Sequence, residues 1–283
     1  MIVHFTKPDP RKSSRTAMQL EIAGGKAVHI RGLRAFWRAL VQVYRSRRRD
    51  TCVFHQQASL PFFLLCLPAL YARGCTIVYD IHDLVIVDNR RGPRILVRNA
   101  ILYACEWVVF HLPRVRPITV SQGLASVCHR RYGRRPEVVY NLHRPLAQTS
   151  LPQRPPAAGD VGALRFVYFG LINPVRLDLP MIESVLAATG GELDVWGVYD
   201  APGFDAAIAR TPHIHYRGEY RAADLAFLKG YDALWFVTFA GRDLNWRYCM
   251  PNKLFQALES GLCLCIPDTF REIADTFASE PIY

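Results

Sequence analysis

The sequence lacks several signals that would place it in a familiar class at once. Its eight cysteines form no CxxC pair and mostly lie in apolar runs, which argues against a disulfide framework or zinc site and favours buried thiols in a reducing cytosol. No signal peptide is recognisable, and the most apolar run, residues 59–72, is too short to span a bilayer. No GxGxxG motif follows the apolar residues 1–5, so the dinucleotide fingerprint is missing.

The chain is long and apolar enough for two domains. Its 283 residues are 51% hydrophobic, and short apolar strands alternate with helical segments in both halves. This alternation predicts α/β domains with doubly wound parallel sheets. A proline-rich stretch at 146–160 can continue neither a helix nor a central strand. We therefore expect a first domain at 1–145, a linker at 146–160 and a second domain at 161–283.

Charge is distributed unevenly between these halves. Residues 1–150 carry 24 of the 35 Lys and Arg but only 8 of the 24 Asp and Glu, which gives a net charge of +16 against −5 for the remainder. Such a one-sided basic surface suits an anionic membrane surface, a nucleic acid or an anionic acceptor.

The clearest amphipathic helix is predicted at 33–44. Its apolar residues recur at helical spacing, while Arg34, Arg38 and Arg45 lie on the other side. With Trp37 nearby, this basic face could rest on anionic lipid headgroups. A surface helix that packs on a sheet and exposes a solvated basic side fits the pattern as well.

A polar cluster, Tyr79–Asp83 in one-letter code YDIHD, follows the apolar strand predicted at 76–79. Ligands bind beyond the carboxyl ends of strands in doubly wound sheets, so Asp80, His82 and Asp83 are candidate catalytic residues. The alternative is that both aspartates cap a turn and the histidine is an ordinary buried imidazole.

The stretch 245–267 predicts an anion site. Pro251, Asn252 and Lys253 open a helix that stops at Gly261, so backbone N–H groups, an amide and an ammonium meet at one point. Arg176, in the loop after Gly170, could add a charge-assisted bond to the same anion. An ordinary helix-to-strand connection is the alternative for 245–267.

These segments together resemble the GT-B glycosyltransferases, specifically the family 4-like group. The resemblance lies in PNKLFQALESG at 251–261, in YDIHD, and in ITVSQGLASVCHRRYG followed by VVYN at 118–141. It implies two Rossmann-like domains, of which the first binds an acceptor and the second a UDP- or GDP-linked sugar. It also implies retention of configuration, and no cofactor or metal; the chain has no DxD motif to hold one.

The resemblance further implies a set of donor-binding residues: Gly170, Arg176, Gly197, Tyr220, Asn252, Lys253 and Gln256. The chain departs from the family at one of these residues and at one further position. Gln256 replaces the glutamate that accepts bonds from both ribose hydroxyls, and Tyr248 replaces a second glutamate, so ribose and sugar binding should be altered. The chain also ends soon after this helix, so the second domain is expected to be short at its C-terminus, either naturally or by truncation.

The resemblance and the basic first half lead to a specific expectation. The protein would be a cytoplasmic, peripheral membrane hexosyltransferase that transfers sugar to a lipid-linked or polysaccharide acceptor in surface-glycan biosynthesis. Three alternatives stay open: a sugar-nucleotide epimerase of the same fold, a non-catalytic membrane-associated scaffold, and a nucleic-acid-binding protein. The last has the least support because no reader motif is recognisable, and no nucleic-acid partner is expected.

Overall fold

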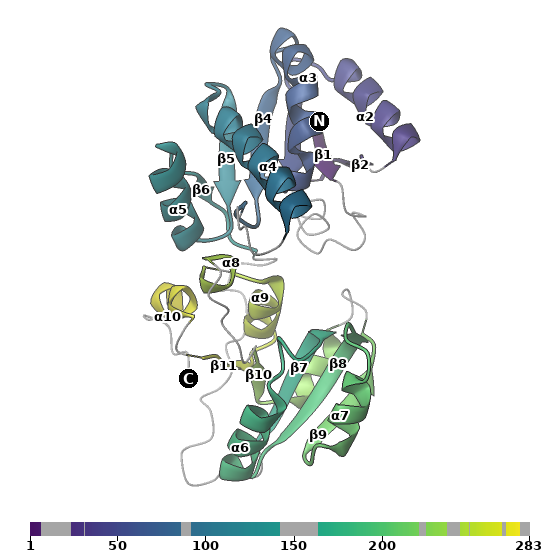
Figure 1. Cartoon of the computed structure of the whole chain (residues 1–283), viewed down its shortest axis with the longest axis vertical. Coiled ribbons are helices and arrows are strands. Elements are labelled where there is room, and N and C mark those ends of the chain that lie inside the picture. The colour runs from purple at the N-terminus through teal and green to yellow at the C-terminus, as the bar shows by residue number, and fades with distance from the viewer. Residues whose placement is uncertain are drawn as a thin grey trace. The chain divides into compact units, whose positions relative to one another are not determined.

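The computed structural model describes residues 1–6, 24–30, 32–85, 92–141, 164–220, 225–236, 244–248, 250–267 and 270–277. The chain divides into two compact units, Met1–Asn141 and Leu142–Tyr283 (Figure 1). The linker predicted at 146–160 lies outside the described residues. Each unit is built around its own parallel sheet, so the predicted α/β class with two parallel sheets is confirmed.

The first unit contains a six-stranded parallel sheet in the order β2-β1-β3-β4-β5-β6. Its strands are β1 (Ile2–Thr6), β2 (Lys26–His29), β3 (Thr51–His55), β4 (Thr76–Ile81), β5 (Val115–Thr119) and β6 (Glu137–Val138). From β2 onward every connection runs in the same direction across the sheet. Right-handed crossovers therefore place the connecting helices on one face.

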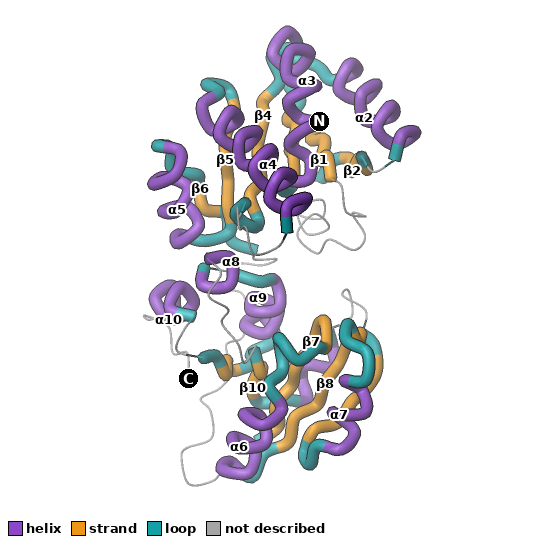
Figure 2. The backbone as a smooth tube through the Cα atoms, in the orientation of Figure 1, coloured by secondary structure: helices purple, strands orange, loops and turns teal. Residues whose placement is uncertain are grey.

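These helices form one layer, which Figure 2 shows as a row of neighbouring coils. Its members are α2 (Leu33–Arg45), α3 (Leu60–Ala72), α4 (Pro93–His111) and α5 (Gln122–Tyr132), and a short 3₁₀ turn, η1 (Gln57–Ser59), precedes α3. Helix α2 contacts α3, α3 contacts α4, and α4 contacts α5. Only the inner side of this layer is covered by the sheet.

The two faces of the first sheet carry different chemistry. Phe5, Phe54 and Tyr79 point toward the helical layer, where Phe54 stacks on Phe63 at 4.5 Å and Tyr79 bonds to α4. Because successive strand residues alternate between faces, His4 and His55 lie on the opposite face. Two buried histidines therefore share one side of a sheet whose other side is an aromatic core.

The second unit contains a five-stranded parallel sheet in the order β11-β10-β7-β8-β9. Its strands are β7 (Arg165–Ile172), β8 (Glu192–Tyr199), β9 (Ile214–Gly218), β10 (Ala233–Trp235) and β11 (Cys263–Cys265). Its helices are α6 (Leu179–Thr189), α7 (Phe204–Arg210), the 3₁₀ helix η4 (Ala226–Gly230), α8 (Leu244–Arg247), α9 (Asn252–Glu259) and α10 (Arg271–Phe277).

Most predicted elements occur where expected, with shifted ends. Strand β5 ends at Thr119, shortly before Ser121, which caps α5 and accepts a hydrogen bond from the Leu124 amide through its side chain. Pro251 is the cap of α9 rather than part of its first turn, and Gly261 takes the expected positive φ of 79°. Strand β2 and helix α7 were not predicted. None of the helices in the described residues combines the length and apolarity that a bilayer crossing requires.

The described cysteines are all free. Burial raises the pKa of Cys52, Cys66 and Cys128 to about 12, so these thiols stay protonated and unreactive at neutral pH. This agrees with the prediction of buried thiols.

Candidate functional site

A hydrogen-bonded cluster lies at the carboxyl ends of β3 and β4. His55 and Asp80 are direct partners in the parallel register, and His55 Nδ1 lies 2.9 Å from Asp80 Oδ2. His82, in the loop after β4, places its Nε2 2.9 Å from the same oxygen. From β1, His4 Nδ1 reaches His55 Nε2 at 3.0 Å. The structure thus joins Asp80 and His82, both predicted, to two histidines that were not.

The cluster is almost fully buried. His4, His55 and Asp80 are 2%, 0% and 0% exposed, while His82 is partly exposed at the edge. Burial, with a smaller contribution from His55, lowers the pKa of His4 to about 4, so this imidazole is neutral at pH 7. A carboxylate accepts hydrogen bonds and donates none, so each neighbouring imidazole offers Asp80 an N–H group.

Gln56 connects the cluster to β3 through an unusual backbone conformation. Its φ is 61° and its ψ is 159°, a region that is essentially reserved for glycine and costs about 1–3 kcal/mol. Its amide N–H donates to the Asp80 carbonyl at 3.0 Å, and its side-chain Nε2 lies 3.3 Å from His82 Nδ1. The strained residue therefore covers the nitrogen of His82 that faces away from Asp80.

Asp83, the third predicted catalytic residue, lies outside this cluster. Its side chain is exposed, and its main-chain carbonyl accepts a hydrogen bond from the Gln57 side chain. The donor atoms of His55, Asp80 and His82 lie within 4.8 Å of one another, so these three could hold a metal ion if both imidazoles gave up the protons that face Asp80. In the structure these spacings are hydrogen-bond distances.

In the second unit, glycines mark the carboxyl ends of three neighbouring strands. Gly170, Gly197 and Gly218 all have positive φ, at 139°, 140° and 108°. A Cβ atom on Gly197 would lie 1.8 Å from the Gly170 carbonyl oxygen, so β7 and β8 can run together here only without a side chain. Gly197 is buried in this contact between the strands, while Gly170 and Gly218 are partly exposed at this edge of the sheet.

Two predicted cations lie close to these glycines. Lys253, at the start of α9, places its Nζ 4.0 Å from the centre of the Tyr168 ring and 3.8 Å from the position of a Cβ on Gly170. Arg176 hydrogen-bonds to Tyr168 and lowers the pKa of its hydroxyl, although burial outweighs this effect and raises that pKa to about 12. The structure thus brings Gly170, Arg176 and Lys253 together around Tyr168, which was not predicted.

The other predicted donor residues surround this group less closely. The ring of Tyr220 meets Phe169 edge-on at 5.6 Å, Asn252 is the first residue of α9, and Gln256 is 7% exposed one turn further on. Tyr248, which replaces an expected glutamate, is half-buried beside α8. The roles of these residues in donor binding stay predictions.

The residues that could have been found from the sequence are the polar ones within apolar strands. His4 lies inside the apolar run VHF and His55 ends the apolar run VFH, where a buried imidazole needs a partner. Gln56 and Tyr168 gave no comparable signal, because the role of Gln56 depends on its backbone conformation and that of Tyr168 on a distant lysine.

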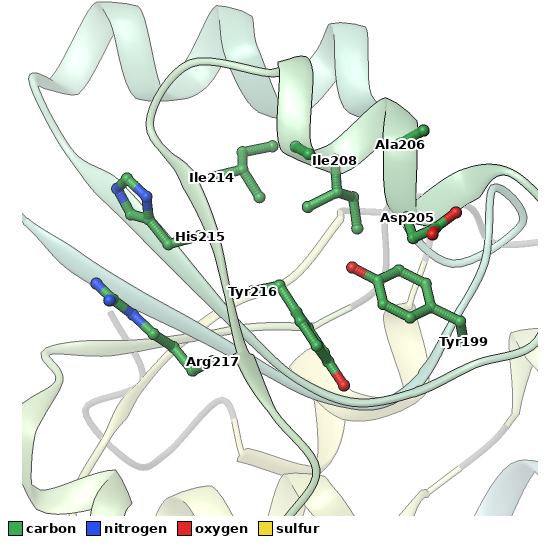
Figure 3. A pocket seen from close by; sticks show the side chains of 9 residues that line it. Tyr199, Asp205, Ala206, Ile208, Ile214, His215, Tyr216 and Arg217 are labelled. Carbon is green, nitrogen blue, oxygen red and sulfur yellow. The ribbon is translucent and has the colours of Figure 1, made fainter.

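A separate cavity of about 640 Å³ opens between α7 and β9 (Figure 3). The rings of Tyr199 and Tyr216 lie next to each other in its lining, with centres 4.9 Å apart. Tyr216 donates a hydrogen bond to the Gly197 carbonyl at 3.0 Å. It is lined by none of the predicted site residues.

Comparison with known proteins finds similarity in structure but not in sequence. No protein-family model matches the chain, and no curated protein matches its sequence. HepE of Anabaena, solved with UDP and glucose, aligns over 98% of this chain and 89% of its own with a TM-score of 0.61 at 12% identity. An E. coli trehalose-6-phosphate structure bound with UDP-2-fluoro glucose aligns over 98% and 86% with a TM-score of 0.55 at 10% identity.

OtsA, solved without ligand, aligns over 88% of this chain and 67% of its own, with a TM-score of 0.53 at 11% identity. At such identities the similarity concerns the fold. It extends over both parallel sheets, because the alignments cover almost the whole chain. The predicted fold is therefore confirmed: the chain has the fold of the GT-B glycosyltransferases.

Proposed function

We propose that the protein is a glycosyltransferase that binds a nucleotide-sugar in its second unit. The observation that carries this proposal is the convergence of Lys253, Arg176 and the start of α9 beside Gly170, where backbone and two cations are available to one anion. The structures with similar folds include two solved with UDP-glucose or UDP and glucose, which supports a UDP-linked donor.

In this proposal, Lys253 and Arg176 bind the diphosphate and stabilise the charge that develops on it as the glycosidic bond breaks. His82, in the first unit, orients an acceptor hydroxyl. The family 4-like motifs further support a retaining transfer of a hexose without a cofactor, and Gln256 offers one ribose hydroxyl a carbonyl acceptor.

Titration calorimetry with UDP, GDP and their glucose and mannose conjugates tests the donor site. Lys253→Ala is expected to weaken the preferred nucleotide about 10- to 100-fold, since a charged hydrogen bond contributes about 1.5–3 kcal/mol. Lys229→Ala, which removes an exposed lysine of the same unit, is the matched control and should bind like the wild type. Equal loss in both variants, or no effect of Lys253→Ala, would contradict this site.

We further propose that the outer side of the helical layer in the first unit rests on an anionic membrane. Apolar side chains are exposed on three adjacent helices, and Trp37 is 56% exposed: they are Trp37, Val41 and Tyr44 on α2, Leu65 on α3, and Val97, Ile101, Trp107 and Val108 on α4. The same helices carry Arg34, Arg38 and Arg45 on α2 and Arg94 and Arg98 on α4.

The charge pattern favours lipid headgroups as the partner. Glu106 is the only acidic residue in α2, α3 and α4, and it is fully buried, so these helices expose arginine and apolar side chains but no carboxylate. This combination fits a peripheral protein at the cytoplasmic face of a membrane, where a lipid-linked glycan or polysaccharide precursor would be the acceptor.

Co-sedimentation with vesicles containing phosphatidylserine tests this second proposal. Arg38→Glu is expected to reduce binding by about 2 kcal/mol, or roughly 30-fold, because each surface arginine contributes about 1 kcal/mol and its charge is reversed. Arg210→Glu, an equal change on an exposed site of α7, should have little effect. The membrane proposal would be contradicted if the protein bound only to neutral vesicles, or if it bound RNA in preference to vesicles.

A further inference from the structure

The geometry around His82 determines which of its two nitrogens is protonated. Its Nε2 lies 2.9 Å from Asp80 Oδ2, and its Nδ1 lies 3.3 Å from the Gln56 amide nitrogen. A carboxylate oxygen requires a donor at Nε2, so a neutral His82 carries its proton there and presents a lone pair at Nδ1. Gln56 must then donate its side-chain N–H to Nδ1. If the Gln56 amide were rotated by 180°, its carbonyl oxygen would face the lone pair of His82 Nδ1, and two acceptors would be in contact.

The chain of hydrogen bonds continues into the sheet through Asp80. This carboxylate is 0% exposed and accepts a second N–H from His55 Nδ1 at 2.9 Å. A neutral His55 then has its lone pair at Nε2, where His4 Nδ1 approaches to 3.0 Å as the donor. His4 and His55 are also stacked, with ring planes 17° apart and centres at 5.3 Å. All three side chains are held by strands, so Asp80 has one fixed position.

The conformation of Gln56 is consistent with a functional contact. Its φ of 61° with ψ of 159° is a conformation that glycine adopts without strain and glutamine does not. Glycine there would stabilise the fold, yet the chain has a residue whose side chain donates to His82. Strain retained at such a place indicates a role for the side chain.

We propose that His82 works through Nδ1. The His4–His55–Asp80 chain fixes the His82 proton on Nε2. Gln56 donates a hydrogen bond to the Nδ1 lone pair until a hydroxyl group of the acceptor replaces the Gln56 amide as the donor. The hydroxyl role rests on the proposed glycosyltransferase function. The tautomer and the contact with Gln56 do not. His4, His55 and Gln56 are thus positioning residues that act on or through His82.

Nitrogen NMR of protein labelled with ¹⁵N-histidine tests the tautomers on the wild-type protein, with His82→Gln used for assignment. The expected spectrum shows His82 protonated at Nε2 and His55 protonated at Nδ1, with His82 Nδ1 shifted by an accepted hydrogen bond. In Gln56→Gly that signal should move toward the value of a nitrogen without a donor. The proposal would be overturned if His82 were protonated at Nδ1. It would also be overturned if the spectrum and the metal content showed zinc bound to both nitrogens that face Asp80.

Thermal unfolding and activity then test the role of the strain. Gln56→Gly is expected to raise Tm by roughly 2–4 °C and to lower release of nucleoside diphosphate from the donor identified by titration at least about 10-fold. The matched control is His213→Gly, which removes the other described positive-φ side chain, at φ 63°, and should raise Tm without changing turnover. Unchanged turnover in Gln56→Gly would overturn the hydroxyl role. If the wild type releases no diphosphate, the glycosyltransferase function and the hydroxyl role fail together, and the tautomer assignment is judged by the spectrum.

Discussion

Gly197→Ala is expected to be the most damaging single-methyl substitution in the second unit. The new Cβ would lie 1.8 Å from the Gly170 carbonyl oxygen, and φ at this position is 140°. Strands β7 and β8 would have to separate at the point where Lys253 approaches Gly170. Backbone strain and overpacking together should lower the free energy of unfolding by at least about 4 kcal/mol, and nucleotide binding should be lost with it.

Chemical denaturation of Gly197→Ala and of Gly190→Ala checks this expectation. Gly190 also has a positive φ, at 64°, but a Cβ there would meet nothing within 4 Å. Its substitution should therefore cost only about 1–2 kcal/mol, the penalty for the left-handed conformation. Similar losses in the two variants would show that the close approach of β7 and β8 is not as described.

The second large effect is expected at Glu106, the buried acid of the helical layer. Its two carboxylate oxygens accept hydrogen bonds from Tyr79 at 2.7 Å and from Tyr132 at 2.6 Å. Glu106→Ala leaves both buried hydroxyl groups without this acceptor and creates a cavity, which should cost about 3–5 kcal/mol. Glu106→Gln, which keeps one oxygen acceptor, should cost clearly less.

The stability contributed by Glu106 should also depend on pH in a defined direction. Burial raises the pKa of its carboxyl, and the hydrogen bonds from Tyr132 and Tyr79 offset this only in part. Between the unfolded and folded pKa values the folded state binds more protons, so stability falls as pH rises. The free energy of unfolding of the wild type, relative to that of Glu106→Gln, should therefore be highest below the ordinary glutamate pKa. It should decrease as the pH rises through the folded pKa. A difference that grows with pH would contradict this.

The fold, and the two cationic side chains of the second unit, Arg176 and Lys253, could be predicted because their sequence signals are local. Alternating strands and helices give the parallel sheets. Gly170 lies near the end of β7, Arg176 in the loop that follows it, and Lys253 at the start of α9. Helix α7 was missed because seven residues give too little periodicity, and it begins after Gly203 in a left-handed conformation.

The cluster in the first unit could be predicted only in part, for a physical reason. Asp80 and His82 are neighbours in sequence, but His4 and His55 join them through the register of β1, β3 and β4, which no local pattern determines. The conformation of Gln56 was hidden for a similar reason. Nothing about a glutamine suggests a positive φ, and it is stable only because the surrounding contacts hold it.

A crystal structure of the protein with UDP-glucose would show directly whether the second unit binds the donor at Lys253 and Arg176. The diphosphate is expected to lie within hydrogen-bond distance of Lys253 Nζ and the first amides of α9, close to Gly170. A nucleotide bound instead in the cavity between α7 and β9 would contradict this expectation. So would crystals in which no nucleotide-sugar identified by the titrations is bound.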